Sequence, residues 1–511
     1  MSKNLRIWTA AILLVIPAVL IYFIASTPLE NAPPPEEPEQ EAKVQSFPED
    51  YDWIPLPDMD LKNPGNMYEL PSLTTEAKNV LDLRSLSDHQ VQVNGEDVTG
   101  KDSYPLTVET ISDEDFITLT VDGKNHHIRT LPQGLSGYTV DNKGAEDGFY
   151  YFTYGDYIVK MNASGQIVYY KNLGTAYSFD FKLNTTEDGK KYYSYLVQNR
   201  TEEKVKVIGY QTTKAVIMDE HYRVVDEVDS LIPTDLVEPE PLENHDFLLL
   251  DLGHYVVSSY YAETVTNIPA HIQQKPGGAN VMAAYLQEIK NQEVIWEWKS
   301  TEYPEFYEQS VEHNDFTNEH AAYADYMHFN AITVDPGDHH FVVSFRNLDS
   351  LVKLNRNTGE VMWILGGKGD QFGLTEEQQF RRQHKVSVLS DGSLLFFNNG
   401  NVLPVAPYPI VPEEDPLRKE QAETTIVKVR LDEENKQIES FESFPTGHFS
   451  ATRGSVHMLD EDQNIVLIGW GSGENNEEHF TEVNLNTGEK LLTFYPHDED
   501  LISYRVYKFA E

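Results

Sequence analysis

Short apolar strands separated by polar turns recur along the chain from about residue 138 onward. Each unit ends in a hairpin whose second strand is rich in aromatic and β-branched residues. The six copies begin at Tyr157, Ala215, Val281, Leu351, Thr425 and Phe480. Further hairpins lie upstream of these copies, for example those that begin at Asp251, Asp335, Ser390 and Asp460. Four-stranded units repeated six times predict a six-bladed β-propeller over residues 136–511, rather than a set of unrelated sandwiches. Residues 503–509 are expected to close the ring against the first blade.

Residues 67–135 carry shorter alternating runs. Four strands are expected, at residues 89–93, 106–110, 116–121 and 126–130, with turns at Asn94-Gly95 and Asp122-Gly123. This spacing predicts a small β-sandwich domain ahead of the propeller, so the fold class is all-β. His126 and His127 are expected to be a surface pair on a strand rather than a metal site.

The first 27 residues predict a membrane anchor or a signal segment. Lys3 and Arg6 precede residues 7–25, which carry no charge and have about the length of a membrane-spanning helix. A cleaved signal peptide is the alternative, although its apolar core is usually shorter. Both interpretations place the rest of the chain outside the cytoplasm, either held at the cell membrane or secreted. Residues 28–66 are assigned to an acidic linker rich in Pro and Glu.

Composition excludes several classes of function. The 511 residues include 39 Lys and Arg against 83 Asp and Glu, a formal net charge of −44, which argues against nucleic-acid binding. There is no cysteine, so a disulfide scaffold, a zinc ribbon, an iron–sulfur site and a cysteine nucleophile are excluded.

The candidate chemistry lies at one position of the repeat. His245, His328 and His384 occupy it in three successive units, so they are expected to converge near the propeller axis. In the last unit the corresponding region is Arg453-Gly454-Ser455. Arg346 ends the strand that follows the His328 strand, and Asn330 lies two residues after His328 on the same face.

This residue set suits an oxyanion. Three histidines alone could hold zinc, but an arginine among them would repel a second cation. Histidines with an arginine instead form a pocket for phosphate, sulfate or carboxylate, and a neutral imidazole can carry the transferred group covalently. The basic run from Arg381 to Lys385 is a further feature that an anionic substrate would need. No metal or cofactor is expected.

Three segments, together with the tail at residues 503–508, resemble the bacterial arylsulfate sulfotransferases. The segments are residues 328–367, 380–401 and 453–472, and the resemblance extends over roughly residues 70–511. It implies a six-bladed propeller behind an N-terminal β-sandwich. It also implies transfer of a sulfuryl group from a phenolic sulfate ester to another phenol, without the usual nucleotide sulfate donor and by a ping-pong route through a sulfohistidine. A homodimer is plausible on the same ground.

The resemblance also implies roles for individual residues. His384 looks like the nucleophile. His328 and Arg346 look like the groups that hold the sulfuryl oxygens, with Asn330 nearby, and His245 looks like a further sulfuryl ligand or a proton-transfer residue. Tyr504 and Arg505 match the tail motif and, together with Asn330, are assigned to substrate binding.

The sequence departs from the family pattern in three ways. Asn398 stands where an aspartate is expected, which puts an orienting role of that carboxylate in doubt. The chain has no disulfide, and it looks anchored where the family is usually secreted free.

Rival functions remain open. They are a non-catalytic anion-binding propeller on the cell surface and a hydrolase of sulfate esters on the same fold. A metal-dependent lactonase or a quinone-dependent dehydrogenase would need acidic calcium ligands or a tryptophan-lined cofactor plane in the channel. The channel positions carry histidine and arginine instead.

Overall fold

The computed structural model describes residues 51–74, 78–106, 116–135, 137–174, 176–198, 209–402, 422–473, 477–498, 501 and 504–510. The predicted anchor and most of the acidic linker lie outside these ranges. None of the helices within them has the length and apolar character that a membrane span requires. The described part of the chain is all-β, as predicted.

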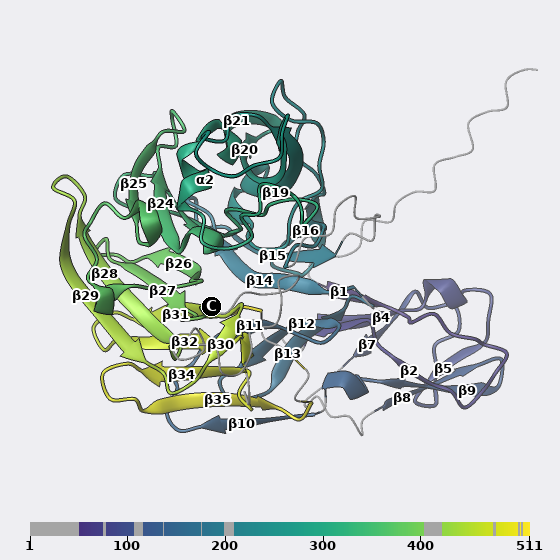
Figure 1. Ribbon diagram of the computed structural model, residues 1–511. Coiled ribbons are helices and arrows are strands. Elements are labelled where there is room, and N and C mark those ends of the chain that lie inside the picture. Colours follow the sequence, from purple (N-terminus) through teal and green to yellow (C-terminus); the bar gives the residue numbers. More distant parts are fainter. Residues whose placement is uncertain are drawn as a thin grey trace, which may run out of the picture. The chain divides into compact units, whose positions relative to one another are not determined.

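Six sheets in the described residues share one plan of four antiparallel strands. In five of them the strands are paired in the order in which they occur along the chain. Figure 1 shows β26 and β31 near the C-terminal end of the chain, with β25, β29 and β35 farther out. These five sheets consist of β14 (Ser178–Thr185), β15 (Lys191–Gln198), β16 (Thr213–Met218) and β17 (Val224–Val228); β18 (Leu248–Asp251), β19 (His254–Val265), β20 (Ala279–Lys290) and β21 (Glu293–Lys299); β22 (Phe329–Val334), β23 (Phe341–Phe345), β24 (Ser350–Leu354) and β25 (Val361–Leu365); β26 (His384–Val388), β27 (Leu394–Asn398), β28 (Thr425–Asp432) and β29 (Gln437–Pro445); and β31 (Ser455–Asp460), β32 (Ile465–Gly469), β34 (Phe480–Asn484) and β35 (Lys490–Pro496). The arrangement is propeller-like, and the predicted hairpins within these sheets are confirmed.

The sixth sheet joins the two ends of the repeat region. Its strands are β36 (Val506–Phe509), β11 (Phe149–Tyr154), β12 (Tyr157–Asn162) and β13 (Ile167–Asn172). The C-terminal strand β36 pairs antiparallel with β11, so the predicted closure is confirmed. At the other end of the region, β10 (Tyr138–Asn142) pairs with β35 of the last sheet. The first sheet of the region therefore contains the C-terminal strand β36, and the last sheet contains β10 from the start of the region.

The segment before residue 136 forms two further sheets. Their strands are β1 (Tyr51–Pro55), β4 (Lys78–Asp82) and β7 (Ser103–Leu106) in one, and β2 (Met67–Glu69), β9 (Lys124–Arg129), β8 (Phe116–Val121), β5 (Val91–Val93) and β6 (Glu96–Asp97) in the other. Asn94 and Asp122 have φ of 51° and 49°, each followed by a glycine with positive φ, as the predicted tight turns require. Strand β1 differs from the prediction because it lies in the stretch assigned to the linker. It pairs in parallel with β4 and buries Ile54.

His126 is buried, so the expectation of a surface pair is wrong for this residue. Side chains alternate across β9, and the position of His126 points the same way as the buried Ile128. His127 is partly exposed. In the described ranges no group of histidine and acidic side chains is arranged to hold a metal ion.

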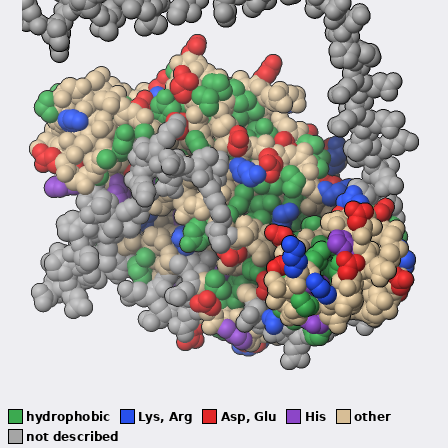
Figure 2. All heavy atoms as spheres, turned by 90° about the vertical axis from the view of Figure 1, so that its right-hand side faces the viewer, with side chains coloured by type: hydrophobic (Ala, Val, Ile, Leu, Met, Phe, Trp, Pro, Cys, Tyr) green, Lys and Arg blue, Asp and Glu red, His purple; other side chains and the backbone are tan. Residues whose placement is uncertain are grey.

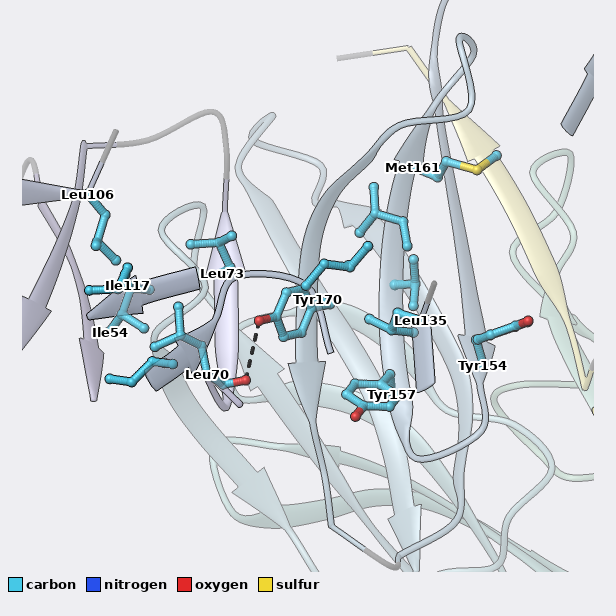
Figure 3. Close-up of a cluster of buried hydrophobic side chains, with 14 of the residues drawn as sticks. Ile54, Leu70, Leu73, Leu106, Ile117, Leu135, Tyr154, Tyr157, Met161 and Tyr170 are labelled. Carbon is cyan, nitrogen blue, oxygen red and sulfur yellow. Dashed lines mark hydrogen bonds between the residues drawn. The ribbon is translucent and has the colours of Figure 1, made fainter. Parts of the chain in front are cut away.

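One hydrophobic cluster joins these two sheets to the repeat region. It includes Ile54, Ile117 and Leu135 together with Met161 and Tyr170 (Figure 3). The Tyr170 hydroxyl donates to two backbone carbonyls before the repeat region, those of Leu70 at 3.3 Å and Thr130 at 2.9 Å. Strand β3 (Ser72–Thr74) adds to this junction by pairing with β13.

Helix is scarce in the described residues. The helical segments are α2 (Glu305–Gln309) and the 3-10 turns η1 (Arg84–Leu86), η2 (Gln133–Leu135), η3 (Ser300–Glu302), η4 (Arg346–Leu348), η5 (Gly367–Gly369) and η6 (Glu376–Gln378). A two-stranded sheet pairs β30 (Ser450–Thr452), which precedes β31 in the chain, with β33 (Ser472–Gly473), which lies between β32 and β34. The face shown in Figure 2 carries acidic and basic side chains interspersed with apolar ones.

Candidate active site

The three histidines of the repeat meet at one cavity. His384 is the first residue of β26, His328 directly precedes β22, and His245 lies three residues before β18. The His245 ring centroid is 5.1 Å from that of His328 and 6.0 Å from that of His384. Equivalent positions at the starts of successive first strands therefore converge, as the repeat predicted.

The cavity has a volume of about 280 Å³. Besides the histidines it is lined by Arg346 and Tyr504, which the sequence assigned to the site. Phe179 and Tyr210 add aromatic surface, which suits a planar aromatic ligand.

His384 is held as a neutral imidazole with a defined tautomer. Its Nδ1 lies 2.7 Å from the carbonyl oxygen of Gly454, which can only accept, so the proton is assigned to Nδ1. The other ring nitrogen, Nε2, then keeps its lone pair. Burial, the Arg505 cation and the neighbouring His245 hold the pKa of His384 well below its usual value.

The other two histidines contact carboxylates instead. The Nδ1 of His328 lies 2.5 Å from Asp325 Oδ2, and the Nδ1 of His245 lies in contact with Glu243 Oε2. Glu243 also accepts hydrogen bonds from the His245 backbone N–H and from Ser258 Oγ at 2.8 and 2.6 Å. A carboxylate on Nδ1 orients the ring and stabilises its protonated form, which suits proton transfer through Nε2. Burial nevertheless lowers the pKa of His245, and Glu243 offsets part of that effect.

One terminal nitrogen of the Arg346 guanidinium is hydrogen-bonded to the protein, and the other has no hydrogen-bond partner among the described residues. Nη1 donates to Glu312 Oε2 at 2.6 Å and to Asn347 Oδ1 at 2.7 Å. Nη2 is buried and has no hydrogen-bond partner among the described residues. A buried donor left unpaired in a cavity is a binding group for an anion.

Asn330 and Arg505 do not line the cavity. Asn330 is fully buried and donates from Nδ2 to the carbonyl of Gln383 at 2.7 Å, next to His384. Arg505 is 0% exposed and pairs with Asp180 and Asp246, each at 3.0 Å. It also donates to the Asn330 carbonyl at 2.7 Å. Both residues therefore support the walls of the site, which corrects the expectation that Asn330 and Arg505 contact the substrate.

The basic run before and after His384 is mostly neutralised. Arg382 pairs with Glu312 and with Asp349, both at 2.7 Å, and Lys385 lies 3.8 Å from Asp246. Burial lowers the pKa of Lys385 to about 8, although Asp246 opposes this effect. Because these carboxylates compensate Arg382 and Lys385, the run does not form the positive surface that the sequence predicted for the substrate. The sequence alone did not reveal the carboxylates.

Asn398 plays a local structural part. Its Oδ1 accepts from the backbone N–H groups of Arg381 and Gly400 at 2.9 and 3.1 Å, and its Nδ2 donates to Thr425 Oγ1 at 3.0 Å. The contact to His384 Nδ1 comes from Gly454. The substitution of the expected aspartate thus leaves the observed orientation of His384 in place.

Some residues at the cavity have no role that the sequence predicted, although Arg453 lies in the region that corresponds to the three histidines. His313 and Arg453 line the cavity, and like His328 they have left-handed backbones, with φ of 53°, 65° and 51° respectively. Such strain in non-glycine residues gathers at functional sites. Glu243 and Asp325 were detectable as acidic residues two and three positions before a candidate histidine.

The sequence profile of the Arylsulfotransferase (ASST) family matches residues 121–505, well over half of the chain. The chain belongs to the arylsulfotransferase family. No curated protein sequence matches it.

Solved structures similar to the chain share little sequence with it. A protein of unknown function from Bacteroides caccae is 11% identical, with 72% of this chain and 100% of that chain covered and a TM-score of 0.39. A Swd1 β-propeller domain from Myceliophteria thermophila is 12% identical over 73% and 90% of the two chains, with a TM-score of 0.32. A catalytically inactive virginiamycin B lyase from Staphylococcus aureus, bound to quinupristin, is 10% identical over 70% and 99%, with a TM-score of 0.28. Similarity at this level carries no conclusion about reaction or substrate.

Proposed function

We propose that the protein transfers a sulfuryl group from a phenolic sulfate ester to a phenolic acceptor through a sulfohistidine on His384. One observation carries the proposal. The Gly454 carbonyl fixes the proton of His384 on Nδ1, so a neutral nitrogen with a lone pair is available in a cavity that is also lined by Arg346, whose buried Nη2 has no hydrogen-bond partner among the described residues.

In the first half-reaction, the lone pair of His384 Nε2 attacks sulfur. The N–S bond forms as the bond between sulfur and the aryl oxygen breaks, and the phenolate leaves with the electron pair of that bond. A histidine protonated on Nε2, either His328 or His245, gives the phenolate its proton. Asp325 and Glu243 stabilise those imidazolium ions.

The second half-reaction reverses these steps with an acceptor phenol. The acceptor loses its proton to the same histidine, its oxygen attacks sulfur, and the N–S bond breaks so that His384 regains its lone pair. Ping-pong kinetics follow from this sequence of steps.

Arg346 holds the transferring group in both steps, together with whichever of His328 and His245 does not transfer the proton. Sulfuryl transfer spreads negative charge over three oxygens, by analogy with phosphoryl transfer. Each fixed donor aimed at such oxygens contributes on the order of 3–4 kcal/mol of transition-state stabilisation. Arg346 carries an unpaired donor for this purpose.

The proposal includes an architecture. Residues 136–511 form a six-bladed propeller, and residues 67–135, together with β1, form a β-sandwich whose two sheets share the cluster that contains Ile54 and Ile117. Residues 1–27 direct the chain out of the cytoplasm as an anchor or signal, and the acidic linker follows.

Incubation of the full chain with 4-nitrophenyl sulfate, with and without added phenol, tests the function. Release of 4-nitrophenol that depends on phenol, and that is lost in His384→Ala, supports the transferase. Release that does not depend on phenol indicates a sulfate-ester hydrolase. Absence of release from a series of aryl sulfates, with retained binding of them, indicates an anion-binding propeller.

A further inference from the structure

Arg453 differs from the other arginines of the site in its ion pairs. Arg346, Arg382 and Arg505 each pair with at least one buried carboxylate. Within the described ranges, no carboxylate forms an ion pair with Arg453, and its side chain lines the cavity. It is therefore the arginine of the cavity whose charge no carboxylate of the described residues compensates.

The local backbone holds Arg453 in place despite an unfavourable conformation. Its φ of 65° lies in the left-handed region, which costs free energy for a residue with a Cβ. Its carbonyl accepts from Asn399 Nδ2 at 3.1 Å, and the next carbonyl, that of Gly454, accepts from His384. Burial lowers the pKa of Arg453. An arginine guanidinium nevertheless stays protonated in proteins at neutral pH, because its ordinary pKa is above about 12. An unpaired cation maintained at such cost is typical of a ligand-binding group.

Arg453 lines the cavity together with aromatic side chains. In the order of the sheets, Arg346 precedes His384 by one sheet and Arg453 follows it by one. Tyr504 lines the same cavity as Arg453. Phe179 lines the same cavity next to Tyr504, with 5.2 Å between the two ring centroids. Because Arg346 and Arg453 belong to the sheets on either side of His384, an aromatic substrate whose sulfuryl group lies between His384 and Arg346 can present a second substituent to Arg453.

We propose that Arg453 binds a second anionic group on the aromatic substrate, so that the preferred substrates are phenols that carry a carboxylate or sulfate besides the reacting oxygen. This inference rests on the proposed function for the placement of the reacting oxygen. The strongly acidic chain, with a net charge of −44, repels such substrates at long range. A local uncompensated cation offsets that repulsion inside the cavity.

Calorimetric titration of the full chain with 4-hydroxybenzoate and with its neutral methyl ester tests the inference. The acid is expected to bind at least about 10-fold more tightly than the ester, because a charge-assisted hydrogen bond is worth that much. In Arg453→Gln the acid should lose at least about 10-fold in affinity while the ester is unchanged, and Arg453→Lys should retain part of the preference. The exposed Arg223→Gln is the matched control and should behave as the unmodified chain.

Two results overturn the inference. One is equal binding of acid and ester by the unmodified chain. The other is loss of acid binding in Arg346→Gln with full retention in Arg453→Gln, which would place the carboxylate at the sulfuryl position. Because binding is measured without turnover, failure of sulfuryl transfer is detected separately and leaves this result interpretable.

Discussion

The carbonyl oxygen of Gly454 lies 2.7 Å from Nδ1 of His384 and joins two successive sheets at the proposed nucleophile. Gly454 has φ of 90°, and a Cβ at this position would lie 2.4 Å from the Phe397 ring. Only glycine therefore lets this carbonyl reach the histidine, and the histidine tautomer depends on it.

Gly454→Ala is expected to slow the first half-reaction by at least about 10-fold, because the displaced carbonyl no longer fixes the proton on Nδ1. The measurement is the rate of 4-nitrophenol release under single-turnover conditions. Gly447→Ala is the control, since Gly447 has a similar φ of 70° but open space around its Cβ position. Equal losses in the two variants would contradict the tautomer argument.

Asp325→Asn is expected to weaken proton donation by His328, because the amide stabilises the imidazolium less than the carboxylate does. Aryl sulfates with poor leaving groups should lose about 100-fold in rate, a typical contribution of a general acid, whereas 4-nitrophenyl sulfate should change little. Glu243→Gln, measured on the same donor series, shows whether His245 carries the proton instead. A uniform loss across all donors in both variants would indicate a structural role only.

Arg505→Met should act on stability rather than on substrate affinity. Asp180 and Asp246 would remain as buried carboxylates without their arginine, and breaking a buried ion pair in this way costs about 3–5 kcal/mol of unfolding free energy. Denaturant unfolding measures this cost, with the exposed Arg223→Met expected within about 0.5 kcal/mol of the unmodified chain. A stable Arg505→Met variant with a raised KM would instead place Arg505 at the substrate.

The protein should become less stable as the pH falls below about 6.5, in part because of His479. Burial lowers the pKa of this histidine to about 4, so between these values the unfolded chain binds more protons than the folded one. Each such group removes up to about 1.4 kcal/mol of unfolding free energy per pH unit over that interval. His479→Gln can still donate to the Thr153 carbonyl and should reduce this slope. An unchanged slope would show that His479 does not contribute.

The features that the sequence predicted are those with a local pattern. Strand alternation and turn residues predicted the hairpins. The convergence of His245, His328 and His384 followed because equivalent repeat positions occupy equivalent places in successive sheets.

The features that the sequence did not predict depend on partners distant in the chain. Glu312, which pairs with Arg346 and Arg382, comes from a connection between sheets and has no sequence signature. Arg505 matched a motif, but only the fold shows that it is buried against Asp180 and Asp246. Strand β1 likewise depends on its pairing with β4, which its own short sequence does not reveal.

The central claim is tested most directly by the intact mass of the protein after incubation with 4-nitrophenyl sulfate alone. The account predicts a mass gain of one sulfuryl group, located on His384 by peptide mapping, lost when phenol is added and absent in His384→Ala. A protein that releases 4-nitrophenol without any mass gain, or that gains the group equally in His384→Ala, would contradict it.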